Sequence, residues 1–178
     1  MSSDDVRAEP SRAEPPRAAL ALRIALYLAL VVGLSNLLLV DAVDRGVLSH
    51  VRNGVATLAA AVLGLFRGDV SVDGARVFVG PGAVDIVNGC TGLDVGIFLA
   101  SAILVFPAPW RLRLRGIAVG FAVVFVANFA RVLTLCVLNA TSPDAFEIVH
   151  IYVWPALISL VCLATLLVWI RSVQPENV

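Results

Sequence analysis

Three side chains that can do chemistry occur within or beside apolar stretches of this sequence: Cys90, Arg131 and His150. A thiol can attack a carbonyl carbon, and an imidazole can take up and return the proton. A guanidinium is a fixed fork of donors that stabilises the negative charge developing on the attacked oxygen. Because an ionisable group inside a membrane span costs about 3 kcal/mol, such groups are candidates for function. Together the three residues indicate acyl transfer by a thiol.

Several polar residues accompany these three. Asn128 precedes Arg131 by three positions and shares its helix face. Asp94 follows Cys90 by four positions, which predicts one face of a helix. Gly89 and Gly92 should let the thiol sit at an exposed turn at a helix N-terminus, where the dipole stabilises a thiolate, and leave room for a substrate backbone. The residues that we expect in supporting roles are Asp85, Asn88, Thr91, Asp94 and Asn128.

The composition indicates that these residues belong to an integral membrane protein. The chain has 178 residues, of which 60% are hydrophobic, and its mean hydropathy is +0.94. Soluble domains are about 45–50% apolar. The formal net charge is zero, so nothing in the composition favours a nucleic-acid partner. All 13 basic residues are arginines, which makes the charge pattern along the chain easy to follow.

Four apolar stretches are long enough to cross a bilayer, which takes about 20 helical residues. They are residues 20–40, 90–106, 116–139 and 146–170. Arginines precede the first stretch, lie between the second and third, and follow the fourth. The positive-inside rule then places the N-terminal tail, the loop at 107–115 and the C-terminal tail in the cytoplasm. An even number of crossings follows, so we interpret residues 44–66 as an interfacial or re-entrant helix on the outer side.

Residues 70–79 predict a small β-hairpin outside the membrane. Valines alternate with polar residues on both sides of Asp73-Gly74, which we expect to form a two-residue turn. Residues 80–82 break the hairpin, and residues 83–87 predict a third short strand leading to Cys90. The expected fold is an all-α polytopic membrane protein with about four transmembrane helices, the outer helix and this hairpin. Its parts are a disordered cytoplasmic tail (1–19), one membrane-embedded catalytic domain (20–171) and a cytoplasmic tail (172–178).

This topology brings the three chemical residues to one depth from different helices. Cys90 begins the second span at the outer boundary, and Arg131 lies about 12 Å from the outer end of its own span. His150 lies about one turn inside the last span. Chance placement would scatter such residues between the two leaflets, so their convergence favours a thiol nucleophile, with His150 as base or acid and Arg131 as the anion stabiliser.

The three motifs resemble those of the exosortase/archaeosortase family, most closely its compact exosortase H subgroup. The resemblance rests on Cys90-Thr91-Gly92, on Asn128 and Arg131 in their spacing, and on His150. It implies a polytopic cysteine transpeptidase in which Cys90 forms a thioacyl-enzyme. Arg131 would then hold the scissile carbonyl, and His150 would protonate the leaving amine and activate the acceptor.

The resemblance also implies the partners and the location. The substrates would be exported proteins whose C-terminus carries a short motif, a transmembrane helix and a basic cluster. The enzyme would lie in the inner (plasma) membrane as a multi-pass protein, with its active site at the extracytoplasmic face. Thiol acyl transfer needs neither a cofactor nor a metal.

Two alternatives remain open at this point. The same residues would serve an intramembrane thiol protease in which water resolves the acyl-enzyme. A non-enzymatic small membrane subunit is the other, with Arg131 and Asp94 as a structural ion pair. A zinc protease is disfavoured because the HExxH motif is absent, and an aspartyl protease is disfavoured because only Asp94 lies in a span. We interpret His50 as a structural histidine.

Overall fold

The computed structural model describes residues 17–174, so most of the expected tails (1–19 and 172–178) lies outside the described residues. Its helices and strands, with π- and 3-10-helical segments written η, are α1 (Arg17–Leu38), α2 (Asp41–Val43), η1 (Asp44–Leu48), α3 (Ser49–Gly64), β1 (Val70–Asp73), β2 (Arg76–Val79), β3 (Gly82–Asp85), η2 (Asn88–Cys90), α4 (Leu93–Val105), α5 (Trp110–Thr141), α6 (Pro143–Ile148), η3 (Val149–Val153) and α7 (Trp154–Val173).

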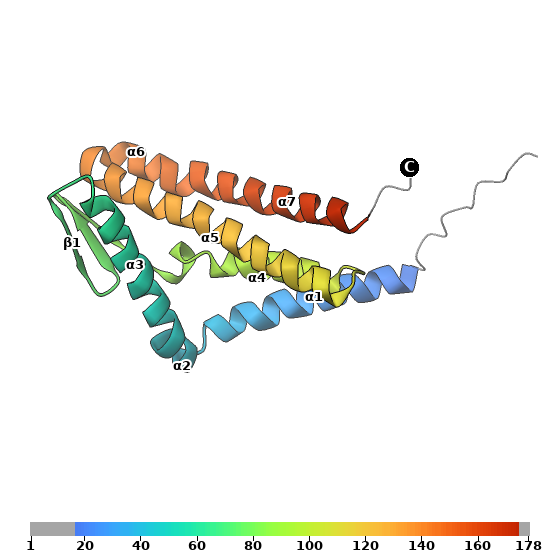
Figure 1. The fold of residues 1–178 in the computed structure, drawn as a ribbon. Coiled ribbons are helices and arrows are strands. Elements are labelled where there is room, and N and C mark those ends of the chain that lie inside the picture. The colour runs from blue at the N-terminus through green and yellow to red at the C-terminus, as the bar shows by residue number, and fades with distance from the viewer. Residues whose placement is uncertain (1–16, 175–178) are drawn as a thin grey trace, which may run out of the picture.

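The long helices lie lengthwise beside one another, and the sheet caps one end (Figure 1). α4 is the central helix, because it contacts α1, α5 and α7. Prolines set the breaks: Pro107 and Pro109 separate α4 from α5, and Pro143 occupies the first turn of α6, where a missing N–H does no harm. α6, η3 and α7 follow one another without a gap, so His150 lies within one long helical element.

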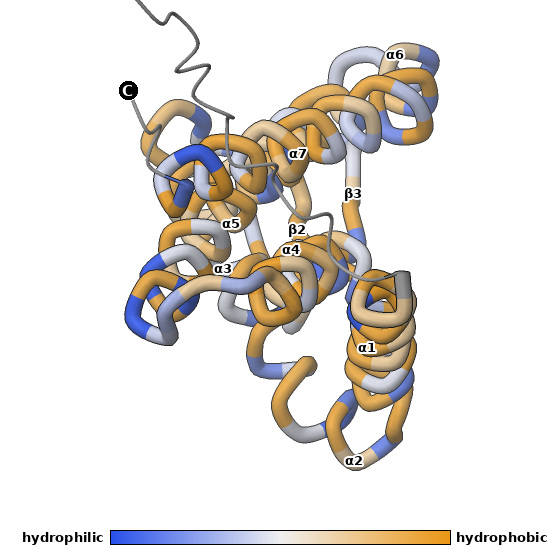
Figure 2. The backbone as a smooth tube through the Cα atoms, turned by 90° about the vertical axis from the view of Figure 1, so that its right-hand side faces the viewer, coloured by the Kyte–Doolittle hydropathy of each residue, from blue (hydrophilic) through white to orange (hydrophobic). Residues whose placement is uncertain are grey.

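The all-α polytopic class is confirmed. Within residues 17–174, four helical elements are long and apolar enough to cross a membrane: Ala18–Leu38, Asp41–Gly64, Trp110–Thr141 and Pro143–Val173. Figure 2 shows apolar residues dominating α1, α5 and α7 along their lengths. Such helices are apolar on most sides because lipid replaces water around them.

The set of these four helices differs from the expected set. The stretch at 90–106 yields only the 13 residues of α4, which rise about 20 Å, less than the hydrocarbon core of about 30 Å. The segment expected as an outer helix is the continuous element Asp41–Gly64, which is long enough to span. In Figure 1, α3 runs across the sheet-bearing end at a steep inclination to α5 and α7.

The expected hairpin and third strand are confirmed as a three-stranded antiparallel sheet in the order β1-β2-β3. The turn differs by one residue from the expected one: Asp73 pairs with Arg76, so Gly74 and Ala75 form the loop. Gly74 adopts a φ of 55°, which glycine accepts without steric strain. The side chain of Asn139 in α5 donates to the carbonyl of Ala83 at 2.9 Å, and this bond fastens the sheet to the end of α5.

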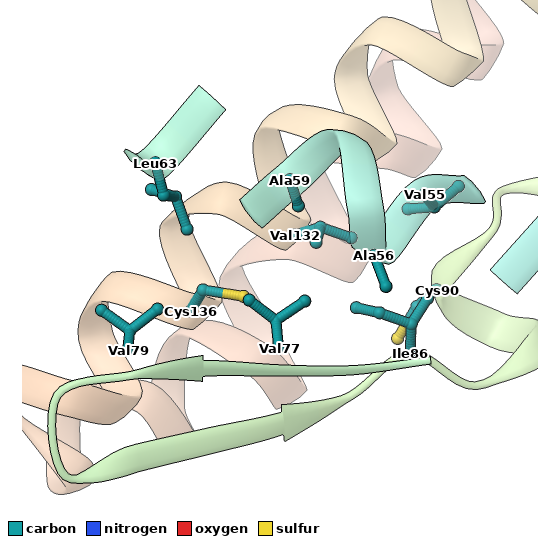
Figure 3. Packing of buried hydrophobic residues seen from close by; sticks show 10 residues of the cluster. All are labelled: Val55, Ala56, Ala59, Leu63, Val77, Val79, Ile86, Cys90, Val132 and Cys136. Atoms are coloured by element: carbon teal, nitrogen blue, oxygen red, sulfur yellow. The ribbon is translucent and has the colours of Figure 1, made fainter. Parts of the chain in front are cut away.

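Two apolar clusters hold these elements together. One joins α4, α5 and α7 around the buried residues Leu99, Ile103 and Val124. The other lies between the sheet, α3 and α5 (Figure 3). It contains the valines of β2, small residues of α3, and two cysteines, Cys90 and Cys136. The sheet-bearing end of the bundle is therefore packed as a protein core, and the candidate thiol is part of it.

Candidate active site

Cys90 lies in a turn ahead of α4 and outside the helix itself. It ends the 3-10 turn η2, and its N–H donates to the carbonyl of Val87 at 2.8 Å. α4 begins three residues later, after Gly92, whose φ is 77°. A Cβ at Gly92 would approach the side chain of Asn128 to 3.2 Å. Both the left-handed backbone and this close approach require glycine, so Gly92 sets the direction in which α4 leaves the turn.

α5 and Thr91 satisfy the carbonyl groups of this turn. The side-chain amide of Asn128 donates to the carbonyl of Cys90. Arg131 Nη1 donates to the carbonyl of Gly89 at 3.4 Å. The hydroxyl of Thr91 donates to the carbonyl of Asn88 at 2.7 Å. Irregular backbone is tolerated at membrane depth only where protein groups satisfy it, so these bonds explain how a turn can precede the short α4.

The thiol is buried, whereas the sequence predicted an exposed turn. Cys90 is 7% exposed. It packs with Val55 and Ala56 of α3 and with Ile86 after β3 (Figure 3). α3 and the strand end thus cover Cys90 on one side. The three cysteines of the chain are free thiols, and Cys136 lies in the same cluster as Cys90.

Arg131 keeps donors available beside this turn. The residue is half-buried, and its Nε atom is buried without a hydrogen-bond partner among the described residues. No salt bridge of Arg131 occurs within residues 17–174, and so none joins it to Asp94. Buried guanidinium donors are normally bonded, and among the described residues the Nε of Arg113 in the same helix is also buried without a partner. Arg131 differs from Arg113 in its position, because its guanidinium contacts the turn that bears Cys90.

His150 approaches the site from the last helical element. It lies in η3, and such π-helical segments often mark functional sites. Its ring centroid is 5.4 Å from that of Phe146, and it lies within electrostatic range of the Arg131 guanidinium. The structure therefore bonds Asn128 to the carbonyl of Cys90 and Arg131 to the carbonyl of Gly89, and His150 lies near enough to Arg131 to interact with its charge.

The structure distributes the other expected residues differently. Thr91 and Asn88 belong to the turn itself. Asp94 lies in the first turn of α4. Asp85 lies outside the site and pairs with Arg76 at 2.6 Å across the sheet. The hydrogen bond from the Arg76 guanidinium holds the pKa of the Asp85 carboxyl below its usual range.

Two residues that the sequence did not single out reach the turn. Asp44 and Arg52 both hydrogen bond to the side chain of Asn88. Their separation of eight residues is no recognised helix pairing, so no pattern in the sequence pointed to them. His50, by contrast, contacts the carbonyl of Gly46 through Nδ1 at 2.5 Å, as a structural histidine does.

Comparison with known proteins gives a match to one protein family. A family model described as transmembrane exosortase (Exosortase_EpsH) matches residues 12–171. No match is found among the curated proteins or among the solved structures. The matched range contains Cys90, Arg131, His150 and the expected supporting residues.

Proposed function

The chain belongs to the transmembrane exosortase family, and on this premise we propose that it is a membrane cysteine transpeptidase. It cleaves the C-terminal sorting tail of exported proteins through a thioacyl-enzyme and transfers the product to an acceptor. One observation carries the proposal: the guanidinium of Arg131, with its Nε unbonded, lies against the turn that bears Cys90. A thiol in a turn that a guanidinium with an unbonded donor contacts suits attack on a carbonyl group.

The first half of the reaction makes the acyl-enzyme. The sulfur of Cys90 forms a bond to the scissile carbonyl carbon while His150 takes the thiol proton. The electron pair of the carbonyl moves to its oxygen, where Arg131 donates to the negative charge. When the pair returns, the carbon–nitrogen bond breaks, and His150 gives the proton to the leaving amine. The tail departs, and the exported protein remains as a thioester on Cys90.

The second half releases the product. His150 removes a proton from the acceptor, which attacks the thioester carbonyl within reach of the same Arg131 donors. The carbon–sulfur bond then breaks, and Cys90 takes back a proton from His150. With water as the acceptor, the same steps give hydrolysis, so the acceptor alone decides between transfer and proteolysis.

The supporting residues hold the turn. Asn128 fixes the carbonyl of Cys90 and packs against Gly92, and Thr91 fixes the carbonyl of Asn88. We assign Asp94 to the first turn of α4 beside the site, where a carboxylate suits the helix N-terminus. A site that must hold a nucleophile within a fraction of an ångström gains from such fixed backbone.

Charge and hydropathy support the location. Arg111, Arg113 and Arg115 lie in the first two turns of α5, and Arg171 lies in the last turn of α7. The opposite end of α5 carries the sheet and, two to three turns deeper, the site. With the arginine-bearing end in the cytoplasm, the site faces the extracytoplasmic side of the inner (plasma) membrane. A substrate with an apolar helix and a basic cluster would lie parallel to these helices in the bilayer.

The test compares strains carrying the native protein, Cys90→Ala, and Cys162→Ala as a matched control in α7. Mass spectrometry of the C-terminal peptides of exported proteins reports processing, and membrane levels are verified for each strain. We expect apolar, arginine-rich tails to persist only with Cys90→Ala. The mass of the native C-terminus distinguishes transfer from hydrolysis. Identical profiles at equal protein levels in all three strains would overturn the proposal.

A further inference from the structure

A closed ring of three side chains lies directly behind the Cys90 turn. Arg52 Nη1 donates to Asp44 Oδ1 at 2.6 Å and also to Asn88 Oδ1. Asn88 Nδ2 donates to the same Asp44 oxygen at 2.9 Å. Each member of this Asp44–Arg52–Asn88 ring is thus bonded to both others, and Asn88 begins the 3-10 turn that ends at Cys90.

A π-helical segment makes the ring geometrically feasible. In a regular α-helix, residues eight positions apart lie about 80° apart around the axis. Asp44 begins the segment η1 (Asp44–Leu48), whose wider turns advance about 80° per residue. Four such steps followed by four α-helical steps make about two full turns, so Asp44 and Arg52 come to one face. The irregularity of this element therefore directs two charged groups at Asn88.

The ring differs from the other ion pair of the same element in its burial. The Arg52 and Asp44 side chains are 19% and 36% exposed. The neighbouring pair of Arg45 and Asp41 is 78% and 83% exposed and joins adjacent turns of one helix. Exposed pairs of that kind contribute little, whereas hydrogen bonds shielded from water are stronger and fix geometry.

The turn is therefore held from two sides. α5 holds its far end through the bond from Asn128 to the carbonyl of Cys90. The ring holds its near end at Asn88, whose own carbonyl also accepts from Thr91. We infer that Asp44 and Arg52 are positioning residues for the Cys90 thiol, acting through Asn88. This inference rests on the proposed function for its catalytic consequence.

The test compares Asp44→Ala and Arg52→Gln with Arg45→Gln, the matched control in the exposed pair. In the purified full-length protein, peptide mass spectrometry follows alkylation of Cys90 by N-ethylmaleimide. Cys136, buried in the same cluster, serves as the internal reference. With loss of the ring, we expect Cys90 alkylation to rise several-fold relative to Cys136. Asp44→Asn, which keeps the acceptor oxygen, should restore most of the protection.

Turnover provides a second readout, using a substrate identified by the C-terminal peptides. Misplacement of the nucleophile should lower kcat by about 10- to 100-fold and leave KM unchanged. The inference fails if the Cys90-to-Cys136 ratio and kcat match those of Arg45→Gln. It also fails if both thiols become reactive together, because the ring then supports the whole fold. Since alkylation needs no enzyme activity, it tests the ring even where Cys90→Ala shows the proposed function to be wrong.

Discussion

The guanidinium of Arg131 touches the turn through one long hydrogen bond, and its Nε has no partner in the described part of the chain. The Nε of Arg113 in the same helix is also buried without a partner among the described residues, so the position of Arg131 beside the Cys90 turn is what distinguishes it. Under the proposed function, these donors would bind the carbonyl oxygen that becomes negatively charged, which is where a preorganised donor is most effective. Replacement of this residue should therefore affect the reaction far more than the fold.

Arg131→Lys should lower the rate of product formation by about 100-fold, because an ammonium group lacks the forked donors. The variant should reach normal membrane levels, since only the 3.4 Å bond to Gly89 is lost. Arg113→Lys is the matched control, because Arg113 lies on the same helix and also has a buried, unbonded Nε. A misfolded Arg131→Lys protein would instead favour a structural subunit.

The two glycines beside Cys90 have different tasks. Gly92 has a positive φ and lies against Asn128, whereas an added Cβ at Gly89 meets no atom within 4 Å. Gly92→Ala should therefore destabilise the protein by about 1–3 kcal/mol, measured by thermal unfolding in detergent. Gly89→Ala is the control and should unfold as the native protein does. Equal unfolding of the two variants would show that the Gly92 conformation carries no strain for alanine.

At the scale of elements, the sequence predicted the helices and the sheet well because their apolar patterns are local. It singled out Cys90, Asn128 and Arg131 as candidate site residues because polar groups are rare in spans, and their roles stay predictions. It did not predict the short α4, since the apolar run continues unbroken through a turn that only the bonds from α5 stabilise. It also missed Asp44 and Arg52, because a π-helical segment leaves no pattern in the sequence.

The ion pair between Arg76 and Asp85 in the sheet should make the stability of the fold depend on pH in the acid range. It should not contribute to catalysis. The Arg76 hydrogen bond lowers the pKa of Asp85, so the carboxylate stabilises the fold above its unfolded-state pKa. This contribution disappears as the pH falls through the lower folded-state pKa. Asp85→Asn should therefore flatten the pH dependence of thermal unfolding in the acid range and leave processing at neutral pH unchanged. A marked loss of processing would return Asp85 to the active site.

The control for Asp85→Asn is a substitution of its ion-pair partner, Arg76. Arg76→Gln removes the same bond, so it should flatten the unfolding profile to the same extent. The double variant should add nothing further. Independent, additive effects would show that the two residues act separately.

At the scale of the whole molecule, the start of α5 and the end of α7 carry Arg111, Arg113, Arg115 and Arg171. The sheet and α3 lie at the other end (Figure 1), where each arginine pairs with an aspartate. The polarity of the bundle places the site outside if the arginine-bearing end is cytoplasmic. The interpretation of α3 as an interfacial helix stays a prediction: α3 is steeply inclined to α5 and α7 (Figure 1), and the element Asp41–Gly64 is also long enough to span. With α3 interfacial, α1 would be the one span between the N-terminal tail and the sheet.

Labelling of intact cells with a membrane-impermeant maleimide tests this topology. Ser71→Cys, on the exposed strand β1, should be labelled from outside. Ser11→Cys, in the N-terminal tail, should be labelled only after the cells are opened. The protein without an added cysteine is the control, because it shows how much its own three thiols are labelled. Labelling of both positions from outside would mean that α3 crosses the membrane.

The covalent thioester on Cys90 is the central claim, and capture by hydroxylamine tests it most directly. Hydroxylamine added to membranes competes with the natural acceptor for a thioester and leaves a hydroxamic acid at the new C-terminus. We predict that this product forms with the native protein, increases with hydroxylamine concentration, and is absent with Cys90→Ala. Continued processing by the native protein with no hydroxamic acid at any hydroxylamine concentration would contradict the thioacyl-enzyme.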